Sequence, residues 1–270
     1  MLVHVIADFG HGDLAFAEVV QRLRSHLPEA EPLLTPVPPF ATLAAGFCVA
    51  QLGLNEAPPG TCIFHNVAPR ADDRSARTDN DGERLAYALL PNGVRVVGVN
   101  AGHAFSFVRE AAQDLRFVMV DSAGSQFRSR DLFPQAFARV VRGEADALAE
   151  PLSPAQVPAV PVGRVAYIDG FGNLKTTLRP AAGPALGSRL RVRIGGVTRE
   201  ATVAGGAFSV PQGGLAFAPG SSGWPLAGGG RVSWMEMFLR GGSAWELFGR
   251  PAVGDAIELE VQEEVLRTQD

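Results

Sequence analysis

The sequence has very few cysteines and lysines and no long apolar run. Its two cysteines, Cys48 and Cys62, lie in apolar surroundings without the spacing of a metal site. We therefore expect both to be small core residues and the protein to occupy a reducing compartment. Lys175 is the only lysine, and arginine therefore carries nearly all the positive charge. No segment reaches the roughly eighteen apolar residues of a membrane span, and residues 2–7 lack the length and basic start of a signal sequence. These absences predict a cytoplasmic protein.

The net charge and the length of the chain narrow the class of protein further. The formal net charge is −4 with a pI near 5.8, and no cluster of basic residues is interleaved with aromatic residues. Neither feature suits a nucleic-acid surface, so we expect no nucleic-acid partner. A chain of 270 residues with 46% hydrophobic content can bury a sizeable core and is long enough for two domains.

The first part of the chain alternates patterns typical of strands and helices. An apolar strand at 2–7 is followed by a turn and by helical spacing over 15–27, with Asp13 placed as the cap. Pro91-Asn92-Gly93 indicates a hairpin between two strands. We therefore predict an α/β domain over residues 1–148, with a mixed sheet and helices on both faces. Its other expected elements are strands at 61–67, 85–89, 94–99 and 117–120 and helices at 42–52 and 132–141.

A change of composition near residue 150 predicts a domain boundary. Residues 149–161 are rich in proline and not periodic, which is typical of a linker. The segment 162–270 then predicts a smaller all-β domain that resembles a barrel or sandwich. Its clearest alternating strand patterns lie at 162–168, 189–194, 197–203 and 257–261.

Two acidic turns are the strongest signals of a binding site. One runs from Asp8 to Asp13 and reads Asp-Phe-Gly-His-Gly-Asp, and the other runs from Asp169 to Asn173 and reads Asp-Gly-Phe-Gly-Asn. Each follows an apolar segment of strand type. A carboxylate at a strand end, followed by glycines that let a ligand approach the backbone, is common in α/β proteins that bind polar small molecules. The simpler alternative is a ligand-free turn in which Phe9 or Phe171 fills the core beneath it.

Seven motifs occur in order along the chain, namely Asp8 to Asp13, Gly60-Thr61, Val97 to Gly102, Ser125 to Phe133, Gly163 to Thr176, Pro219 to Gly223 and Glu236 to Ala244. As an ordered set they resemble the S-adenosyl-L-methionine (SAM) hydroxide adenosyltransferases, or SAM hydrolases, which are related to fluorinating and chlorinating enzymes. The resemblance implies hydrolysis of SAM to adenosine and methionine by attack at C5′. It also implies a homotrimer with the ligand between subunits, and no cofactor or metal.

The resemblance assigns a ligand-binding role to residues in both halves of the chain. Asp8 would accept hydrogen bonds from the ribose hydroxyls, for which an ionised carboxylate is the natural acceptor. Asp169 would bind the methionine ammonium, with Ser222 beside it, and Asn173 would read the adenine together with the backbone of the segment that ends at Ala244. The ligand-binding residues implied in this way are Asp8, Asp169, Phe171, Asn173, Ser222, Arg240, Gly242 and Ala244.

The chain departs from the family where the attacking water is activated. The position of the family's Asp falls on Ala68, and that of its His falls on Arg128. Ala68 cannot accept a proton, and an arginine stays protonated at any accessible pH. The family's Arg corresponds to Arg77 or Arg84 in a loop that is longer here than usual. The catalytic candidates that remain are Arg84, Arg128 and Ser125.

Three functions follow from these departures. In the first, the chain is still a hydrolase whose base is one of Asp72, Asp73, Asp121, His65 or His103. In the second, it binds SAM or adenosine without catalysis. In the third, Arg128 with Arg130 or a loop arginine admits an anionic nucleophile or cosubstrate, which would make the protein another adenosyltransferase. An arginine near a sulfonium is repulsive unless an anion lies between them.

Structural explanations compete with each of these roles. His65 lies on an apolar strand and is more often a core histidine than a base. Asp72 and Asp73 are typical of a solvated loop. Arg130-Asp131 fits an ion pair near the start of a helix.

Overall fold

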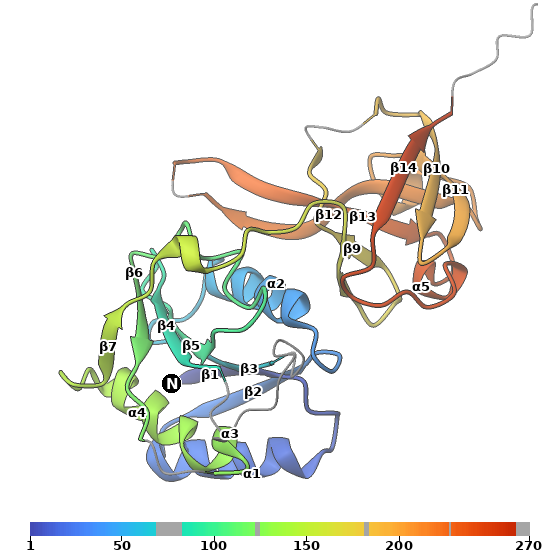
Figure 1. The fold of residues 1–270 in the computed structure, drawn as a ribbon. Coiled ribbons are helices and arrows are strands. Elements are labelled where there is room, and N and C mark those ends of the chain that lie inside the picture. Colours follow the sequence, from blue (N-terminus) through green and yellow to red (C-terminus); the bar gives the residue numbers. More distant parts are fainter. Residues whose placement is uncertain (69–82, 122–124, 181–183, 227, 263–270) are drawn as a thin grey trace, which may run out of the picture. The chain divides into compact units, whose positions relative to one another are not determined.

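The computed structural model describes the chain except for residues 69–82, 122–124, 181–183, 227 and 263–270 (Figure 1). It divides into two compact units. The first comprises Met1–Val160 and Pro225–Gly229, and the second comprises Pro161–Trp224 and Gly230–Asp270. No helix among the described residues is long and apolar enough to cross a membrane.

A seven-stranded mixed sheet forms the first unit, in the order β2-β1-β3-β5-β4-β6-β7. Strands β2, β1, β3 and β5 are parallel to one another, whereas β4 pairs antiparallel with β5 and β6, and β6 pairs antiparallel with β7. The carboxyl ends of β1, β3 and β5 therefore lie at one edge, where the turn after β1 carries Asp8. The strands are β1 (Leu2–Ala7), β2 (Glu31–Pro36), β3 (Cys62–Asn66), β4 (Leu85–Leu89), β5 (Arg95–Val99), β6 (Asp114–Val118) and β7 (Leu148–Pro151).

Three expected helices and the expected hairpin are confirmed. Helix α1 begins after Asp13, whose Oδ1 accepts a hydrogen bond from the Ala15 backbone N–H at 2.8 Å. Alternate residues of β1 pack with α1 and α4 in one core, as Val5 does with Val19 and Phe137. The helices are α1 (Leu14–His26), α2 (Thr42–Gly53), α3 (Arg128–Asp131) and α4 (Phe133–Arg142).

The proline-rich stretch expected as a linker is ordered in its first part. The start of this stretch belongs to strand β7, which pairs with β6. Beyond β7, Leu152 and Val157 are buried. The Arg109 guanidinium donates to the Val157 carbonyl at 2.7 Å. Prolines are tolerated here because β7 is an edge strand, where a missing N–H breaks no ladder hydrogen bond. The division between the units falls only after Val160.

The second unit is built on another seven-stranded mixed sheet, in the order β14-β10-β11-β12-β13-β9-β8. The pair β11 and β12 is parallel. The edge strands of this sheet, β8 and β14, are linked by two backbone hydrogen bonds. Ile257 N–H donates to the Gly163 carbonyl at 2.8 Å, and Val165 N–H donates to the Asp255 carbonyl at 3.0 Å. The elements are β8 (Val165–Ile168), β9 (Leu174–Thr176), β10 (Arg189–Ile194), β11 (Val197–Val203), β12 (Leu215–Pro225), β13 (Arg231–Leu239), α5 (Ala244–Leu247) and β14 (Ile257–Val261).

Candidate functional site

The turn after β1 is organised by hydrogen bonding and by aromatic packing. Asp8 Oδ2 accepts the Phe40 backbone N–H at 2.9 Å, and Phe40 has a left-handed φ of 63°. Phe9 packs edge-on against Phe16 and Phe127, with ring centroids 5.2 and 6.0 Å away. Phe9 thus fills the core beneath the turn, while the carboxylate of Asp8 fixes an unusual backbone conformation on the neighbouring loop. The sequence did not point to Phe40, because a backbone N–H donor can belong to almost any residue type.

The end of β3 offers a hydrogen-bonded pair of neutral groups. Ser129 Oγ donates to Asn66 Oδ1 at 2.8 Å, and Ser129 is buried. Ala68, where the resemblance expects a carboxylate, packs against the same apolar core as Phe9 and Phe127. Neither an amide nor an ordinary hydroxyl accepts a proton from water near neutral pH. Asn66 and Ser129, the described polar residues here, can therefore position a water molecule but cannot deprotonate it.

Ser125 belongs to a charged network around α3. Its Oγ donates to Asp131 Oδ2 at 2.5 Å, and Arg130 Nε donates to the other carboxylate oxygen at 2.6 Å. Arg130 also reaches Glu18 of α1 at 3.3 Å. The hydrogen bond from Arg130, followed by that from Ser125, lowers the pKa of Asp131 to about 2. These contacts support the structural explanation of Arg130-Asp131, because they tie α3 to α1.

The two arginines predicted for catalysis have contacts within the first unit. Arg84 pairs with Glu150 at 2.5 Å and lies 3.6 Å over the Phe117 ring. Arg128 donates to the Glu83 carbonyl at 3.4 Å, and its guanidinium lies 5.1 Å from the Phe133 ring centroid. Arg77 lies outside the described residues.

Three of the five candidate replacement bases lie among the described residues. His65 is completely buried against the Phe105 ring, and burial lowers its pKa to about 3. His103 Nδ1 lies 3.1 Å from Ser106 Oγ, and burial lowers its pKa as well. Asp121 is exposed, whereas Asp72 and Asp73 lie outside the described residues. Within the described part of the chain, no group of three or more His, Cys, Asp or Glu side chains could hold a metal ion.

The second acidic turn is closed by its own carboxylate. Asp169 Oδ1 accepts the backbone N–H groups of Phe171 and Asn173, both at 3.0 Å, and Oδ2 accepts Asn173 Nδ2 at 3.0 Å. Gly172 supplies the left-handed φ of 77° that the turn requires. Phe171 is 83% exposed, so the alternative in which it fills the core is wrong. The exposed ring is instead available to contact a ligand.

The turn that begins at Asp169 packs on the segment that leads into α5. Trp245 N–H donates to the Gly172 carbonyl at 2.8 Å, and Ser243 caps α5 by accepting the Glu246 N–H at 3.1 Å. Ala244, the first residue of α5, is fully buried. Two motifs that are far apart in sequence are thus in direct contact within the second unit.

Two other implied ligand residues have internal partners. The Arg240 guanidinium donates to the Val210 carbonyl at 2.7 Å, and Gly242 N–H donates to the Leu239 carbonyl at 3.1 Å. Ser222 is buried on β12. The structure brings Asp169, Asn173 and the start of α5 together, but among the described residues no hydrogen bond joins them to Ser222.

A buried ion pair, which the sequence did not predict, adjoins Asp169. Lys175 Nζ lies 3.0 Å from Glu236 Oε2 and 3.8 Å from Asp169 Oδ2. Lys175 and Glu236 are directly opposite each other on β9 and β13. On the other side, a Cβ at Gly220 would lie 1.8 Å from Glu236 Oε1, so this glycine gives the carboxylate its space. The one feature of the sequence that could have drawn attention to this ion pair is that Lys175 is the only lysine.

Gly172→Ala is expected to disrupt the contact between the Asp169 turn and α5. A Cβ at this position would lie 2.0 Å from Ser243 Oγ, and the φ of 77° is unfavourable for alanine. We expect a loss of about 2–3 kcal/mol in the free energy of unfolding, measured by urea denaturation. Gly170→Ala is the matched control because a Cβ there meets nothing within 4 Å. Equal stability of the two variants would contradict the proposed packing.

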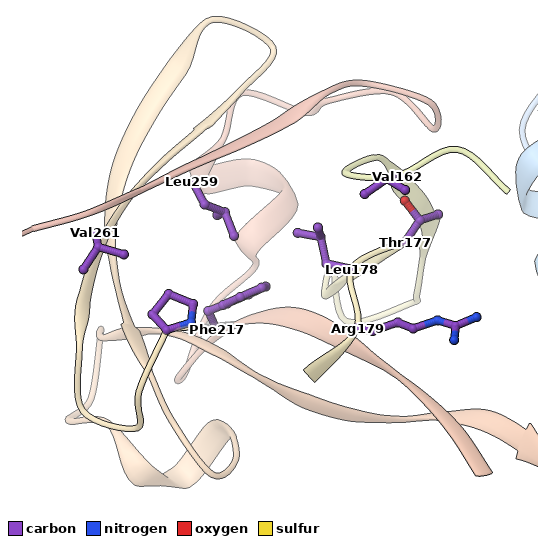
Figure 2. A pocket seen from close by; sticks show the side chains of 8 residues that line it. Val162, Thr177, Leu178, Arg179, Phe217, Leu259 and Val261 are labelled. Carbon is purple, nitrogen blue, oxygen red and sulfur yellow. The ribbon is translucent and has the colours of Figure 1, made fainter. Parts of the chain in front are cut away.

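A separate apolar cavity of about 430 Å³ lies in the second unit (Figure 2). Leu178, Phe217 and Leu259 line it. The Arg179 side chain extends away from these residues in Figure 2, and its guanidinium lies 5.3 Å from the Trp234 ring centroid. None of the predicted site residues lines this cavity, and it offers few polar groups to orient a ligand.

Comparison with known proteins establishes the fold. An uncharacterized conserved protein from Thermotoga maritima superposes with a TM-score of 0.70 and 20% identity, over 96% of this chain and 100% of that chain. A conserved hypothetical protein from Thermus thermophilus gives a TM-score of 0.66 and 22% identity, over 96% of this chain and 99% of that chain. No protein-family model matches the chain. No curated protein matches it either. At these identities the likeness concerns the fold alone.

Proposed function

We propose that the protein binds SAM and hydrolyses it to adenosine and methionine by attack of water at C5′. The observation that carries the proposal is the contact of the Asp169 turn with the start of α5 and the residue before it. The Gly172 carbonyl accepts the Trp245 N–H, and Gly172 lies directly against Ser243. These are the two motifs to which the resemblance assigns the adenine and the amino-acid end of the ligand. Asp8, at the carboxyl end of β1, would bind the ribose.

Displacement of methionine at C5′ depends more on the surroundings of the reacting atoms than on a strong acid. As the C5′–O bond forms and the C5′–S bond breaks, the attacking water passes a proton to solvent and methionine leaves as a neutral thioether. The sulfonium charge thereby disappears from the site, so a dry and preorganised pocket favours the transition state. Asn66 and Ser129 would orient the nucleophilic water at the end of β3. Arg128 would act only through its charge, because a guanidinium does not accept a proton.

Binding without catalysis is the second candidate function. It is favoured by Ala68, which packs in the apolar core where the resemblance expects a carboxylate. Transfer to an anionic nucleophile held by Arg128 has less support, because the guanidinium contacts the Glu83 carbonyl and the Phe133 ring.

We also infer an arrangement that completes the site. A homotrimer would bring Asp8 of one chain to Asp169 of the next, so that the ligand binds between subunits. Helices would cover both faces of the first sheet, because Phe64 packs with α1 and α4 whereas the adjacent Ile63 lies beside Gly53 of α2. The second unit would be a β-barrel, closed by the hydrogen bonds between its edge strands. We place the protein in the cytoplasm because both cysteines are buried free thiols.

The test is incubation of the purified protein with SAM, with adenosine and methionine followed by chromatography and binding followed by calorimetry. We expect adenosine to form, and Asp8→Ala to reduce its formation at least tenfold because hydrogen bonds to a charged acceptor are lost. His11→Ala is the control, since His11 is exposed on the same turn. Binding without product would support the second function, whereas no binding and no product would refute the assignment of the ligand.

A further inference from the structure

A row of residues crosses four strands of the second unit and passes beside Asp169 at Lys175. Tyr167 on β8 pairs with Lys175 on β9, Lys175 pairs with Glu236 on β13, and Glu236 lies against Gly220 of β12. The exposed fractions of the charged side chains are 22% for Asp169, 12% for Lys175 and 1% for Glu236. Accessibility to a ligand therefore falls in that order, and Glu236 acts only through Lys175.

Lys175 has donor capacity beyond its bond to Glu236. An ammonium group carries three N–H donors. Among the described residues, Nζ makes one hydrogen bond, to Glu236 at 3.0 Å, while its 3.8 Å separation from Asp169 is longer than a hydrogen bond. Glu236 therefore fixes the ammonium without saturating it.

A lysine at this position contrasts with the rest of the chain. Of the 24 lysine and arginine residues, Lys175 alone is a lysine. A lysine presents a compact point charge whose donors rotate, whereas a guanidinium is a wide planar fork. The space around Glu236 is small, since even a Cβ at Gly220 would clash with its carboxylate. The compact ammonium of a lysine suits this space.

We propose that Lys175 is a specificity-determining residue that binds the carboxylate of an amino-acid ligand while Asp169 binds its ammonium. This inference rests on the proposed binding of SAM at the Asp169 turn. Asp169 Oδ2 and Lys175 Nζ present opposite charges 3.8 Å apart. An α-amino acid carries its ammonium and carboxylate on one carbon, in the complementary order. A ligand with the ammonium but no carboxylate would bring a second cation to Lys175 without compensation.

The test compares three ligands by calorimetry: SAM, its decarboxylated analogue, and 5′-methylthioadenosine, which lacks both groups. The wild-type protein is expected to bind SAM at least tenfold more tightly than the decarboxylated analogue. Lys175→Met is expected to remove this preference while leaving 5′-methylthioadenosine affinity within twofold. Arg193→Met is the control, because Arg193 forms an exposed pair with Glu258 between opposite residues of β10 and β14.

A second variant and a second readout guard against loss of folding. Lys175→Met/Glu236→Gln removes the buried charge imbalance and is expected to show the same loss of preference. With ε-15N-lysine the protein has a single side-chain ammonium resonance, which should shift on addition of SAM and not with 5′-methylthioadenosine.

The outcomes separate the inference from the function on which it rests. If the wild-type protein binds none of the three adenosine compounds, the proposed function fails and the inference fails with it. If it binds them but the variants keep the preference for SAM, or lose affinity for all three equally, only the role of Lys175 is refuted.

Discussion

Acidification from pH 6.5 to pH 3 is expected to remove about 4 kcal/mol from the free energy of unfolding through His65 alone. His65 is fully buried, and burial lowers its pKa from 6.5 to about 3. Between these two values the unfolded chain binds a proton at this residue and the folded chain does not. Stability therefore falls as the pH decreases, by about 1.4 kcal/mol per pH unit. Urea denaturation at a series of pH values measures the slope.

His65→Leu tests the assignment. The variant should lose this part of the slope, and it should be at least as stable as the wild type near pH 7. The second expectation arises because the two ring nitrogens have no hydrogen-bond partner among the described residues, so leucine leaves no buried polar atom unsatisfied. An unchanged slope in His65→Leu would show that other groups cause the loss of stability.

Lys175→Met should destabilise the protein by about 3–5 kcal/mol, because the Glu236 carboxylate would remain buried without its cation. Glu236 is only 1% exposed, so solvent cannot replace the lost ammonium. The side chain of Lys175 is itself 12% exposed, and methionine can fill most of its volume. Thermal or urea denaturation near pH 7 measures the change.

The companion variants isolate the charge effect from packing. Lys175→Met/Glu236→Gln should recover more than half of the loss, because neither member then carries a charge. Arg193→Met removes an ion pair that also joins opposite residues of neighbouring strands, but its members are more than half exposed. We expect less than about 1 kcal/mol for that pair. Similar losses in Lys175→Met and Arg193→Met would show that burial of Glu236 does not govern the effect.

Local patterns predicted much of the first unit. The helices expected at 15–27 and 132–141 correspond to α1 and α4, and the hairpin at Pro91-Asn92-Gly93 joins β4 and β5. Strand β2 was missed because it contains Pro32 and Pro36 and is largely exposed, and only pairing with β1 makes it a strand. Strands β12 and β13 were missed as well. The alternation of β12 is interrupted by glycines that serve close packing, such as Gly220 beside Glu236.

The candidate site was predictable only in its local parts. The turn from Asp169 to Asn173 is held by hydrogen bonds over a few residues, which its sequence encodes directly. The pair of Lys175 and Glu236 was not predictable, because its members are 61 positions apart and meet through strand pairing. The resemblance pointed to Arg84, but the long-range contact with Glu150 that holds its guanidinium could not be anticipated.

The link between β8 and β14 also bears on how the protein emerges from the ribosome. All seven strands of the first sheet lie before residue 152, so this sheet can assemble while later residues are still being synthesised. The second sheet cannot, because its first strand is bonded to the segment that leads into Ile257–Val261. Until that strand has left the exit tunnel, the edges of β8 and β10 stay open to pairing with other nascent chains. The contact of the Asp169 turn with Trp245 of α5 is likewise completed among the later parts of the molecule.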